Sequence, residues 1–536
     1  MSRSIYWGDM HTQFNLAHMR MQEADGVDAV AEPPDDLGDC ETFVRRAFEG
    51  ARDYLDFFPI VYYPAHFIRD SETGFRTETV GPKHYFARDW QMICALVREY
   101  HAPGEFVTFA GYEWTGDRTR WGDHNVFYPF DDPPLDLALH IDQLYANLRE
   151  TGGIAIPHHT AYAFANRGKD WAHYDEEISP FAEVFSVHGS SEGCNAPFTM
   201  TRNGAMAPRV SMNSVHAALD RGHRLGIIAS GDNGLGFAGK WGIGLMAAVA
   251  DDLTRESLWE AFKARRVYGV TGDRIKLDYS LGDAPMGSLI EGSGPRTLRA
   301  SVECTEALDR IEVIRDGRVA HTHCHAGTWE PPSEGTVRCK IPFEFGWGPA
   351  ASYGFEVARK SWQGRFRLAE GRLLSVEGAF TRHGNSSHQT GDAEVEFSLT
   401  TDPRVHAAED TCQQRLIVEI EAPADALCVL ECDNHRITFT PAEAMRRSGL
   451  IVYDHECRDR IRQQFGDQSG KWDDIRDAVY HNSHIIKRHI AIPAAGYTAS
   501  IELEQTDFAP GRNYVYLRVS QLNGQYAWSS PVWVDG

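Results

Sequence analysis

Short apolar runs alternate with longer amphipathic stretches through the first half of this 536-residue chain. About seven runs have the length of a buried strand, and they lie at residues 4–7, 55–61, 106–112, 153–157, 182–187, 225–230 and 267–271. Between them, apolar side chains recur every three or four residues, as at Phe43, Ala47 and Ala51, which is the period of a helix with one buried face. This alternation predicts an α/β fold in which βα units surround a parallel sheet or barrel.

A different pattern begins near residue 275. Strand-like pieces such as 298–304, 310–314, 416–420 and 514–519 are separated by Gly, Pro, Asn and Asp, and helical periodicity is limited to about residues 440–465. The sequence therefore predicts two domains, a β/α unit over residues 1–275 and an antiparallel, β-sandwich-like region over residues 276–536. We expect the second domain to serve packing or assembly into a homo-oligomer, with carbohydrate binding as the alternative.

The charge of the chain excludes some classes of partner. It has 53 basic and 76 acidic residues and a formal net charge of −23, whereas binding to nucleic acid or to an anionic membrane needs a basic face. The sequence has no uncharged apolar stretch of about 18 residues, and charged residues stand near its start, where a signal peptide needs apolar ones. We therefore expect a cytoplasmic protein whose partner is a small-molecule substrate.

Potential metal ligands follow nearly every predicted strand of the first half. They are Asp9 and His11, His66, Glu113, His158 with His159, His188, and Asp232. Because the carboxyl ends of parallel barrel strands converge on one mouth, we expect these side chains to form one cluster. Imidazole and carboxylate ligands suit Zn, Mn or Fe, and a carboxylate such as that of Glu113 can bridge two ions. The pattern predicts a site for divalent metal ions.

A metal site of this kind favours hydrolysis. A bound ion lowers the pKa of its water toward about 7 and polarises the bond to be broken. We find no phosphate-binding loop, dinucleotide fingerprint or His-Glu-x-x-His motif in the sequence, and residues 189–192 lack the flanks of a serine nucleophile elbow.

Several motifs are similar to those of a large bacterial family long known as a domain of unknown function. They lie at residues 6–11, 109–115, 122–126, 156–159, 188–192, 221–233, 264–272 and 527–534. The N-terminal half of that family resembles a PHP (polymerase and histidinol phosphatase) metal-dependent hydrolase. The resemblance implies a distorted seven-stranded β/α barrel with a multinuclear metal site, in a superfamily known mostly for phosphoester hydrolysis.

Some positions of the family pattern differ in this chain. The second histidine after the first strand is replaced by Gln13, and histidines after the second and sixth strands are replaced by Tyr63 and Gly234. The resemblance places the last two histidines on the same ion, so their joint loss implies that one metal position was abandoned and that one or two divalent ions remain. The ligands implied are His11, Gln13, Glu113, His124, His158 or His159, His188, and Asp232. His66 either replaces a lost ligand or is structural.

Aromatic residues are dense near these ligands, which predicts an aromatic or bulky apolar substrate. Tyr62, Trp114 and Trp121 are the predicted substrate-binding residues. Lys240 is a further candidate, as a cation for a substrate carboxylate or phosphate.

These observations predict a metal-dependent hydrolase that uses metal-activated water on an ester, lactone, amide or phosphoester bond. We expect Tyr63 and Arg118 to stabilise the developing anion, and Asp232 or His188 to transfer protons. A metal-dependent lyase or isomerase is the alternative, because an ion that polarises a carbonyl also promotes carbon–carbon cleavage. A binding protein that has lost catalysis is the alternative from another class, since several ligands are missing.

Overall fold

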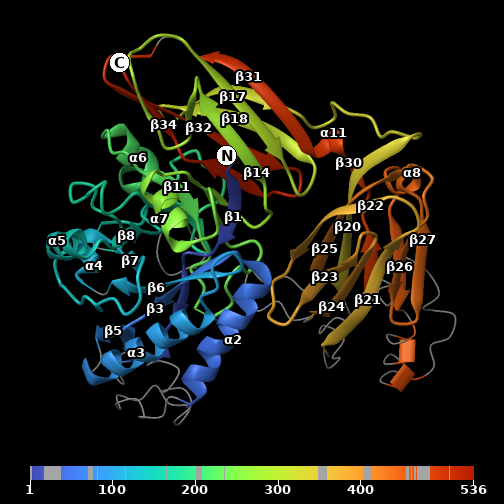
Figure 1. Ribbon diagram of the computed structural model, residues 1–536, viewed down its shortest axis with the longest axis horizontal. Coiled ribbons are helices and arrows are strands. Elements are labelled where there is room, and N and C mark those ends of the chain that lie inside the picture. Colours follow the sequence, from blue (N-terminus) through green and yellow to red (C-terminus); the bar gives the residue numbers. More distant parts are fainter. Residues whose placement is uncertain are drawn as a thin grey trace.

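The computed structural model describes most of the chain (Figure 1). The described ranges are 3–16, 38–69, 76–80, 83–114, 116–164, 166–200, 208–234, 236–347, 359–401, 413–453, 483–505 and 508–536, with residues 455, 458–459, 462–463 and 466. None of the helices in these ranges combines the length and the apolar character that a membrane-spanning helix needs.

The first half is built on the centre of a large mixed sheet. Strands β1 (Ser4–Gly8), β3 (Phe57–Tyr62) and β6 (Val107–Trp114) are parallel neighbours, and the short β2 (Thr12–Phe14) also pairs with β3. Beyond them, β7 (His124–Tyr128), β8 (Ile154–Pro157), β12 (Leu245–Ala250) and β13 (Val267–Val270) join antiparallel. A separate sheet holds β9 (Phe181–Ser186), β10 (Gly189–Ser190) and β11 (Gly226–Ala229). The mixed α/β architecture is confirmed, but this pairing does not close into the expected seven-stranded barrel.

Helices pack on this half, as their apolar periodicity indicates. They are α2 (Gly38–Tyr54), α3 (Lys83–Tyr100), α4 (Arg118–Trp121), α5 (Ile141–Thr151), α6 (Val215–Asp220) and α7 (Arg255–Lys263), with a 3-10 turn at Ser211–Asn213. Thr254 caps the start of α7, since its side chain accepts a hydrogen bond from the Ser257 amide. A two-stranded ribbon, β4 (Ala65–Arg69) and β5 (Arg76–Val80), follows β3.

The large sheet continues past residue 275 into the end of the chain. Strand β13 pairs antiparallel with β33 (Tyr526–Ser529), which pairs with β32 (Arg512–Gln521). The sheet is completed by β16 (Leu289–Glu291), β18 (Leu308–Arg315), β19 (Arg318–Cys324) and β34 (Val532–Asp535). Strand β13 also lies close to β11. A glycine is needed at position 269 of β13, because a Cβ atom there would lie 2.4 Å from the Ala229 amide nitrogen. The predicted units therefore share one sheet, and the boundary at residue 275 stays a prediction.

The rest of the second half is antiparallel, as its strand pattern indicates. One sheet contains β14 (Lys276–Leu281), β15 (Ala284–Pro285), β17 (Arg296–Glu303) and β31 (Thr498–Gln505). A second contains β20 (Thr336–Trp347), β22 (Arg372–Ala379), β25 (Gln414–Pro423), β28 (Gly449–Tyr453), β29 (His484–Arg488) and β30 (Ile492–Pro493). A third contains β21 (Lys360–Leu368), β23 (Ser386–Gly391), β24 (Glu394–Thr401), β26 (Cys428–Cys432) and β27 (His435–Phe439). Short helices α8 (Pro441–Ala444) and α11 (Ala494–Tyr497) complete it. Side chains of the second and third sheets share one hydrophobic core.

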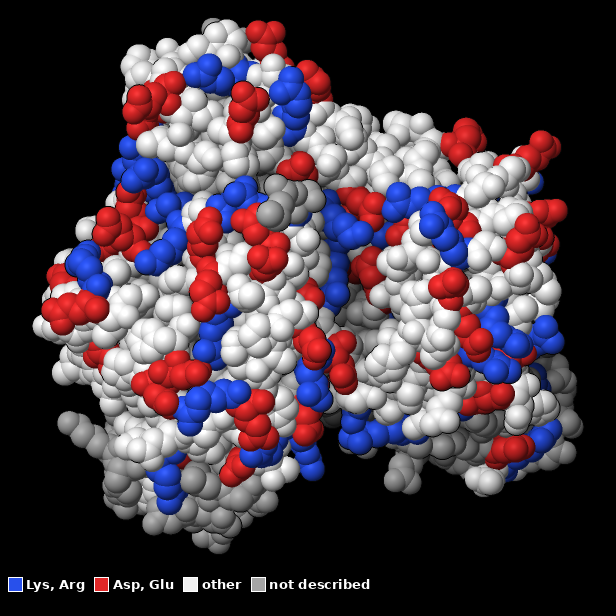
Figure 2. Space-filling view, viewed as in Figure 1, with Lys and Arg blue, Asp and Glu red and all other residues white. Residues whose placement is uncertain are grey.

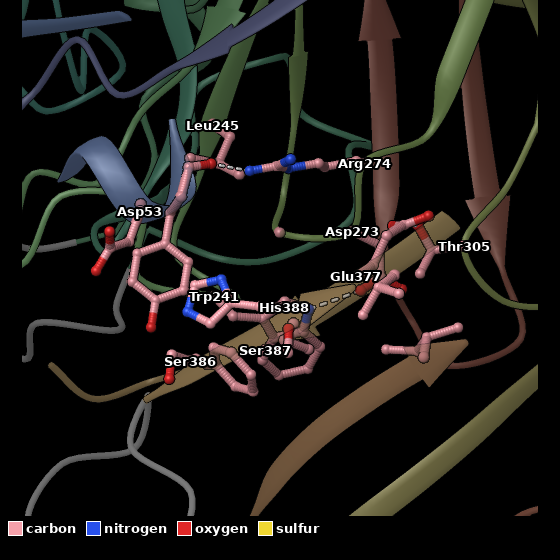
Figure 3. A pocket seen from close by; sticks show the side chains of 18 residues that line it. Asp53, Trp241, Leu245, Asp273, Arg274, Thr305, Glu377, Ser386, Ser387 and His388 are labelled. Carbon is pink, nitrogen blue, oxygen red and sulfur yellow. Dashed lines mark hydrogen bonds between the residues drawn. The ribbon is translucent and has the colours of Figure 1, made fainter. Parts of the chain in front are cut away.

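A polar cavity of about 110 Å³ marks where these parts meet (Figure 3). Tyr54 at the end of α2, Trp241, and Glu377 on β22 are among its lining residues. The Trp241 indole donates a 2.6 Å hydrogen bond to Oδ1 of Asp273, so polar groups of the wall bind one another. On the face drawn in Figure 2, acidic and basic side chains are interspersed and form no continuous basic patch.

Candidate metal centre

Buried histidines and carboxylates gather near the ends of β1, β8 and β11, along β9 and just before β7. They form three overlapping groups: His11, His158, Glu183 and Asp232; Asp123, His158 and His159; and His159, His188 and Asp232. Within each group, one ligand atom per residue lies within 4.8 Å of all the others. The structure thus brings together the histidines that the sequence placed after different strands.

Two carboxylates flank the imidazole of His11. Its Nε2 atom lies 3.3 Å from Oδ1 of Asp232, and its Nδ1 atom lies 3.0 Å from Oε2 of Glu183. Burial by itself would lower the pKa of His11, but Asp232 and Glu183 outweigh it and raise this pKa to about 10. This end of the site therefore attracts positive charge strongly.

Asp232 also faces a second set of imidazoles. Its Oδ2 atom lies 2.9 Å from Nε2 of His188 and 3.8 Å from Nε2 of His159. Burial would raise the pKa of Asp232, yet His11 and His188 hold it well below its usual range. The backbones of His159 and Asp232 have φ values of 32° and 49°, a left-handed conformation that non-glycine residues adopt at a cost. Asp232 thus offers one oxygen to each histidine set.

Several buried polar atoms of the cluster have no hydrogen-bond partner, which is expected of side chains that bind a metal ion. Among the described residues, both ring nitrogens of His158, Nδ1 of His159 and Oε1 of Glu183 are buried and accept or donate no hydrogen bond. Each such atom costs about 1–3 kcal/mol if it stays unsatisfied. Burial and neighbouring cationic groups lower the pKa values of His158 and His159 well below the usual range, so both rings are neutral, as metal ligands must be. Imidazoles beside carboxylates fit a divalent ion such as Zn, Mn or Fe.

Two arginines balance the carboxylates on the other side of the cluster. Arg118 donates to Oε1 of Glu113 at 3.1 Å and to the Tyr63 hydroxyl at 2.8 Å, and its Nε lies 2.8 Å from Oδ1 of Asp123. Arg167 also donates to Glu113 and Asp123, at 3.4 and 2.5 Å. Burial raises the pKa of Glu113 to about 8 despite Arg118, whereas the two arginines lower that of Asp123 despite its burial. This side carries no excess of negative charge.

Three predicted ligands differ from expectation. Glu113 lies in none of the three groups because Arg118, Arg167 and the Gln13 amide occupy its oxygens, so the structure does not support its expected bridging role. Gln13 is likewise outside the groups, with Nε2 3.4 Å from Nε2 of His11. His124 is turned away, since its Nδ1 lies 3.3 Å from the Gly122 carbonyl and its Nε2 lies 3.4 Å from the Tyr145 hydroxyl.

The predicted aromatic substrate contacts belong to the core. Tyr62 donates to Asp89 at 3.0 Å, and the fully buried Trp114 donates to the Ala138 carbonyl at 2.6 Å. Trp121 packs on Trp114 and His140. All three rings are buried, and their role in substrate binding stays a prediction.

The remaining candidates have separate outcomes. Lys240 is buried, and its role stays a prediction. The side chain of His66 lies outside the described part of the chain. Asp9 accepts from the backbone amides of His11, Gly231 and Gly239 at 2.9–3.1 Å and from a threonine hydroxyl, so it fixes the backbone beside the ligands and is not itself one of the grouped residues.

Sequence reasoning missed Asp123, Glu183 and Arg167. Glu183 had a signal, because it is a charged residue inside a run that reads as a fully buried strand. Asp123 directly precedes a predicted ligand, but Arg167 lies in a loop and no pattern in the sequence marks it.

Fold and site define a mixed α/β protein with a buried His and carboxylate cluster able to hold divalent ions. A family model described as "Protein of unknown function (DUF3604)" matches residues 49–138. An uncharacterized protein of Chlamydia pneumoniae is 29% identical over 255 residues, which is 44% of this chain and 40% of that protein. An uncharacterized protein of Chlamydia trachomatis is 29% identical over 254 residues, covering 43% and 40%. The chain thus spans about two fifths of the length of these relatives.

One solved structure is similar over much of the chain. It is described as a two-domain protein containing a predicted PHP-like metal-dependent phosphoesterase, from Bacteroides vulgatus. The match covers 82% of this chain and 95% of that one, at 10% identity and a TM-score of 0.31.

Proposed function

We propose that this protein is a metal-dependent hydrolase whose centre holds one or two divalent ions. The observation that carries the proposal is the set of buried, unpartnered imidazole nitrogens of His158 and His159 beside the carboxylate of Asp232. Asp232 is the residue best placed to be shared by two ions, because its oxygens face His11 on one side and His188 and His159 on the other. It would take the bridging role that the sequence predicted for Glu113.

Divalent ions held here would supply an activated water and polarise the bond to be broken. The chain itself supplies fixed positive charge. Arg118 and Arg167 have side chains 10% and 28% exposed, so Arg167 reaches the more open side of the site. With the Tyr63 hydroxyl, these guanidinium groups would stabilise negative charge that develops on a substrate oxygen. We expect a small substrate with an ester, lactone, amide or phosphoester bond.

Elemental analysis with a matched pair of histidine variants tests the proposal. His158→Ala removes two unpartnered nitrogens, whereas His124→Ala removes an equally buried ring whose nitrogens already face protein groups. We expect His158→Ala to lose at least one ion per chain and His124→Ala to keep the wild-type content. A wild-type protein that holds no metal after purification and readdition would overturn the proposal.

Activity assays address the reaction class. We expect chelator-sensitive, metal-restorable turnover in a screen of ester, lactone, amide and phosphoester probes. Product formed in ¹⁸O-labelled water should carry one labelled oxygen. Metal-dependent turnover without that label would favour the lyase or isomerase alternative instead.

A further inference from the structure

The hairpin that carries His188 is built from β9 and β10. Gly189 pairs with Ser186 and Ser190 with Phe185, which leaves His188 at the tip. The Val187 amide donates to the Gly231 carbonyl at 3.2 Å, so the tip lies against the turn that presents Asp232. Gly189 has φ +97°, and a Cβ atom there would lie 1.6 Å from the Thr199 carbonyl oxygen. The tip therefore has little freedom. The position of His188 depends on where the foot of the hairpin is held and on the Tyr162 hydroxyl, which lies 2.6 Å from Nδ1 of its ring.

Glu192, at the foot of this hairpin, is held by the end of the chain. Its fully buried carboxylate accepts hydrogen bonds from three side chains of β32 and β33. The Tyr516 hydroxyl donates to Oε1 at 2.5 Å, Arg518 Nη1 donates to both oxygens at 3.1 and 3.0 Å, and the Trp528 indole donates to Oε2 at 2.9 Å. The backbone of Glu192 is fixed as well, since its carbonyl accepts from the His216 amide at 2.9 Å.

The buried ion pair between Glu192 and Arg518 is not expected to add much stability. Replacing a buried ion pair with packed apolar groups is often neutral or stabilising. A carboxylate bound from three directions instead fixes position, and a ligand must be held to within about 0.5 Å of its productive place. His188 needs this accuracy because its Nε2 lies 2.9 Å from Oδ2 of Asp232.

We propose that strands β32 and β33 position His188 for metal binding through Glu192. The second half of the chain would then help to set the geometry of the metal centre. This inference rests on the proposed function, because it assumes that His188 binds an ion. Glu192, Tyr516, Arg518 and Trp528 are positioning residues, since none of them belongs to the ligand groups.

Two tyrosines on β32 give a matched test. Tyr516 donates to Glu192 and also lies 2.7 Å from Nε2 of His216, whereas Tyr514 donates at 2.8 Å to Asp220 of α6. Both side chains are buried, and Tyr→Phe removes one hydroxyl from each. The readouts are Co²⁺ affinity, the visible absorption spectrum of the Co²⁺-loaded protein and the melting temperature. The spectrum reports the ligand geometry, which a loss of general stability does not change.

We expect Tyr516→Phe to weaken Co²⁺ binding about 10-fold, the lower end of the loss caused by removing a direct outer partner of a ligand, and to alter the spectrum. Tyr514→Phe should leave affinity and spectrum unchanged, and Glu192→Gln should have a larger effect than Tyr516→Phe. If wild-type protein binds Co²⁺ but both tyrosine variants behave alike, the inference fails while the proposed function stands. Wild-type protein that takes up no Co²⁺ would overturn the proposed function and this inference with it.

Discussion

Nδ1 of His11 lies 3.0 Å from Oε2 of Glu183, and both side chains are buried. The Ser230 hydroxyl donates to the same carboxylate oxygen at 2.6 Å, which fixes its direction. Metal-binding histidines commonly donate their second ring N–H to a carboxylate, which sets the tautomer and the ring orientation. Glu183 therefore orients His11 so that Nε2 faces Asp232.

Replacing Glu183 by Gln should weaken metal binding. The amide accepts a weaker hydrogen bond and removes one negative charge beside His11, so we expect a 10- to 100-fold loss of Zn²⁺ affinity, on the order seen for such partners. Competition with a chromophoric chelator measures it. Glu105→Gln, at an exposed position, is the control and should bind Zn²⁺ like the wild type. Equal affinity of the Glu183 and Glu105 variants would contradict the orienting role.

Glu113→Gln should separate metal binding from turnover. The structure surrounds Glu113 with Arg118, Arg167 and Gln13 and leaves it out of the ligand groups, so the variant should keep its metal content. Its turnover should fall at least 10-fold, because an amide oxygen holds the two guanidinium groups more weakly than a carboxylate oxygen does. Elemental analysis and the assay found by substrate screening measure the two effects on one sample. Loss of metal from this variant would contradict the prediction and show that Glu113 contributes to metal binding.

The sequence predicted the ligand-bearing strand ends better than the individual carboxylates. Histidines after three of the predicted strands meet because those strands end on the same side of the fold. Glu113 and Asp232 look alike in sequence, as acidic residues at the end of an apolar run. They differ in their partners, because the oxygens of Glu113 are bound by Arg118, Gln13 and Arg167. Arg167 comes from a distant loop, whose position depends on tertiary contacts that no local sequence pattern records.

The strand pairing does not show the expected seven-stranded barrel, and one reason is that an apolar run predicts a strand but not its direction. Strand β6 ends at Trp114 and β7 begins at His124, a connection too short for a parallel crossover of a dozen residues or more. These strands are therefore antiparallel. Strand β7 begins with His124 and Asn125 and was not among the predicted apolar runs. Its effect on the topology therefore could not be predicted from those runs.

Asp9→Asn should destabilise the backbone next to the metal centre. The carboxylate accepts from the amides of His11, Gly231 and Gly239 and from a threonine hydroxyl. An amide NH₂ in place of one oxygen would face two donors, so we expect a cost of about 1–3 kcal/mol, seen as a lower melting temperature in calorimetry. Asp251→Asn, which breaks only an exposed 3.6 Å ion pair with Arg3, should melt like the wild type. A melting temperature for Asp9→Asn equal to that control would refute the role.

Lys169 gives the protein a predictable dependence of stability on pH. Burial lowers the pKa of Lys169 to about 7, although its Nζ donates to the His173 carbonyl at 2.7 Å. Above about pH 10.4, the ordinary lysine pKa, this group is neutral in both the folded and the unfolded chain. As the pH falls from there to about 7, the unfolded chain takes up a proton that the folded chain does not, so the folded state loses relative stability. Below that pH both states are protonated and the difference is constant.

Lys169→Met has no such proton, so its stability relative to the wild type should increase as the pH falls from 10 to 7. The full change is on the order of 4 kcal/mol, since each unit of pKa difference corresponds to about 1.4 kcal/mol. Urea unfolding followed by tryptophan fluorescence at pH 7, 8, 9 and 10 measures it, and taking the difference between the proteins removes the other titrating groups. Lys263→Met, at an exposed position, should show a flat difference. A flat profile for Lys169→Met as well would mean that Lys169 stays protonated in the folded protein.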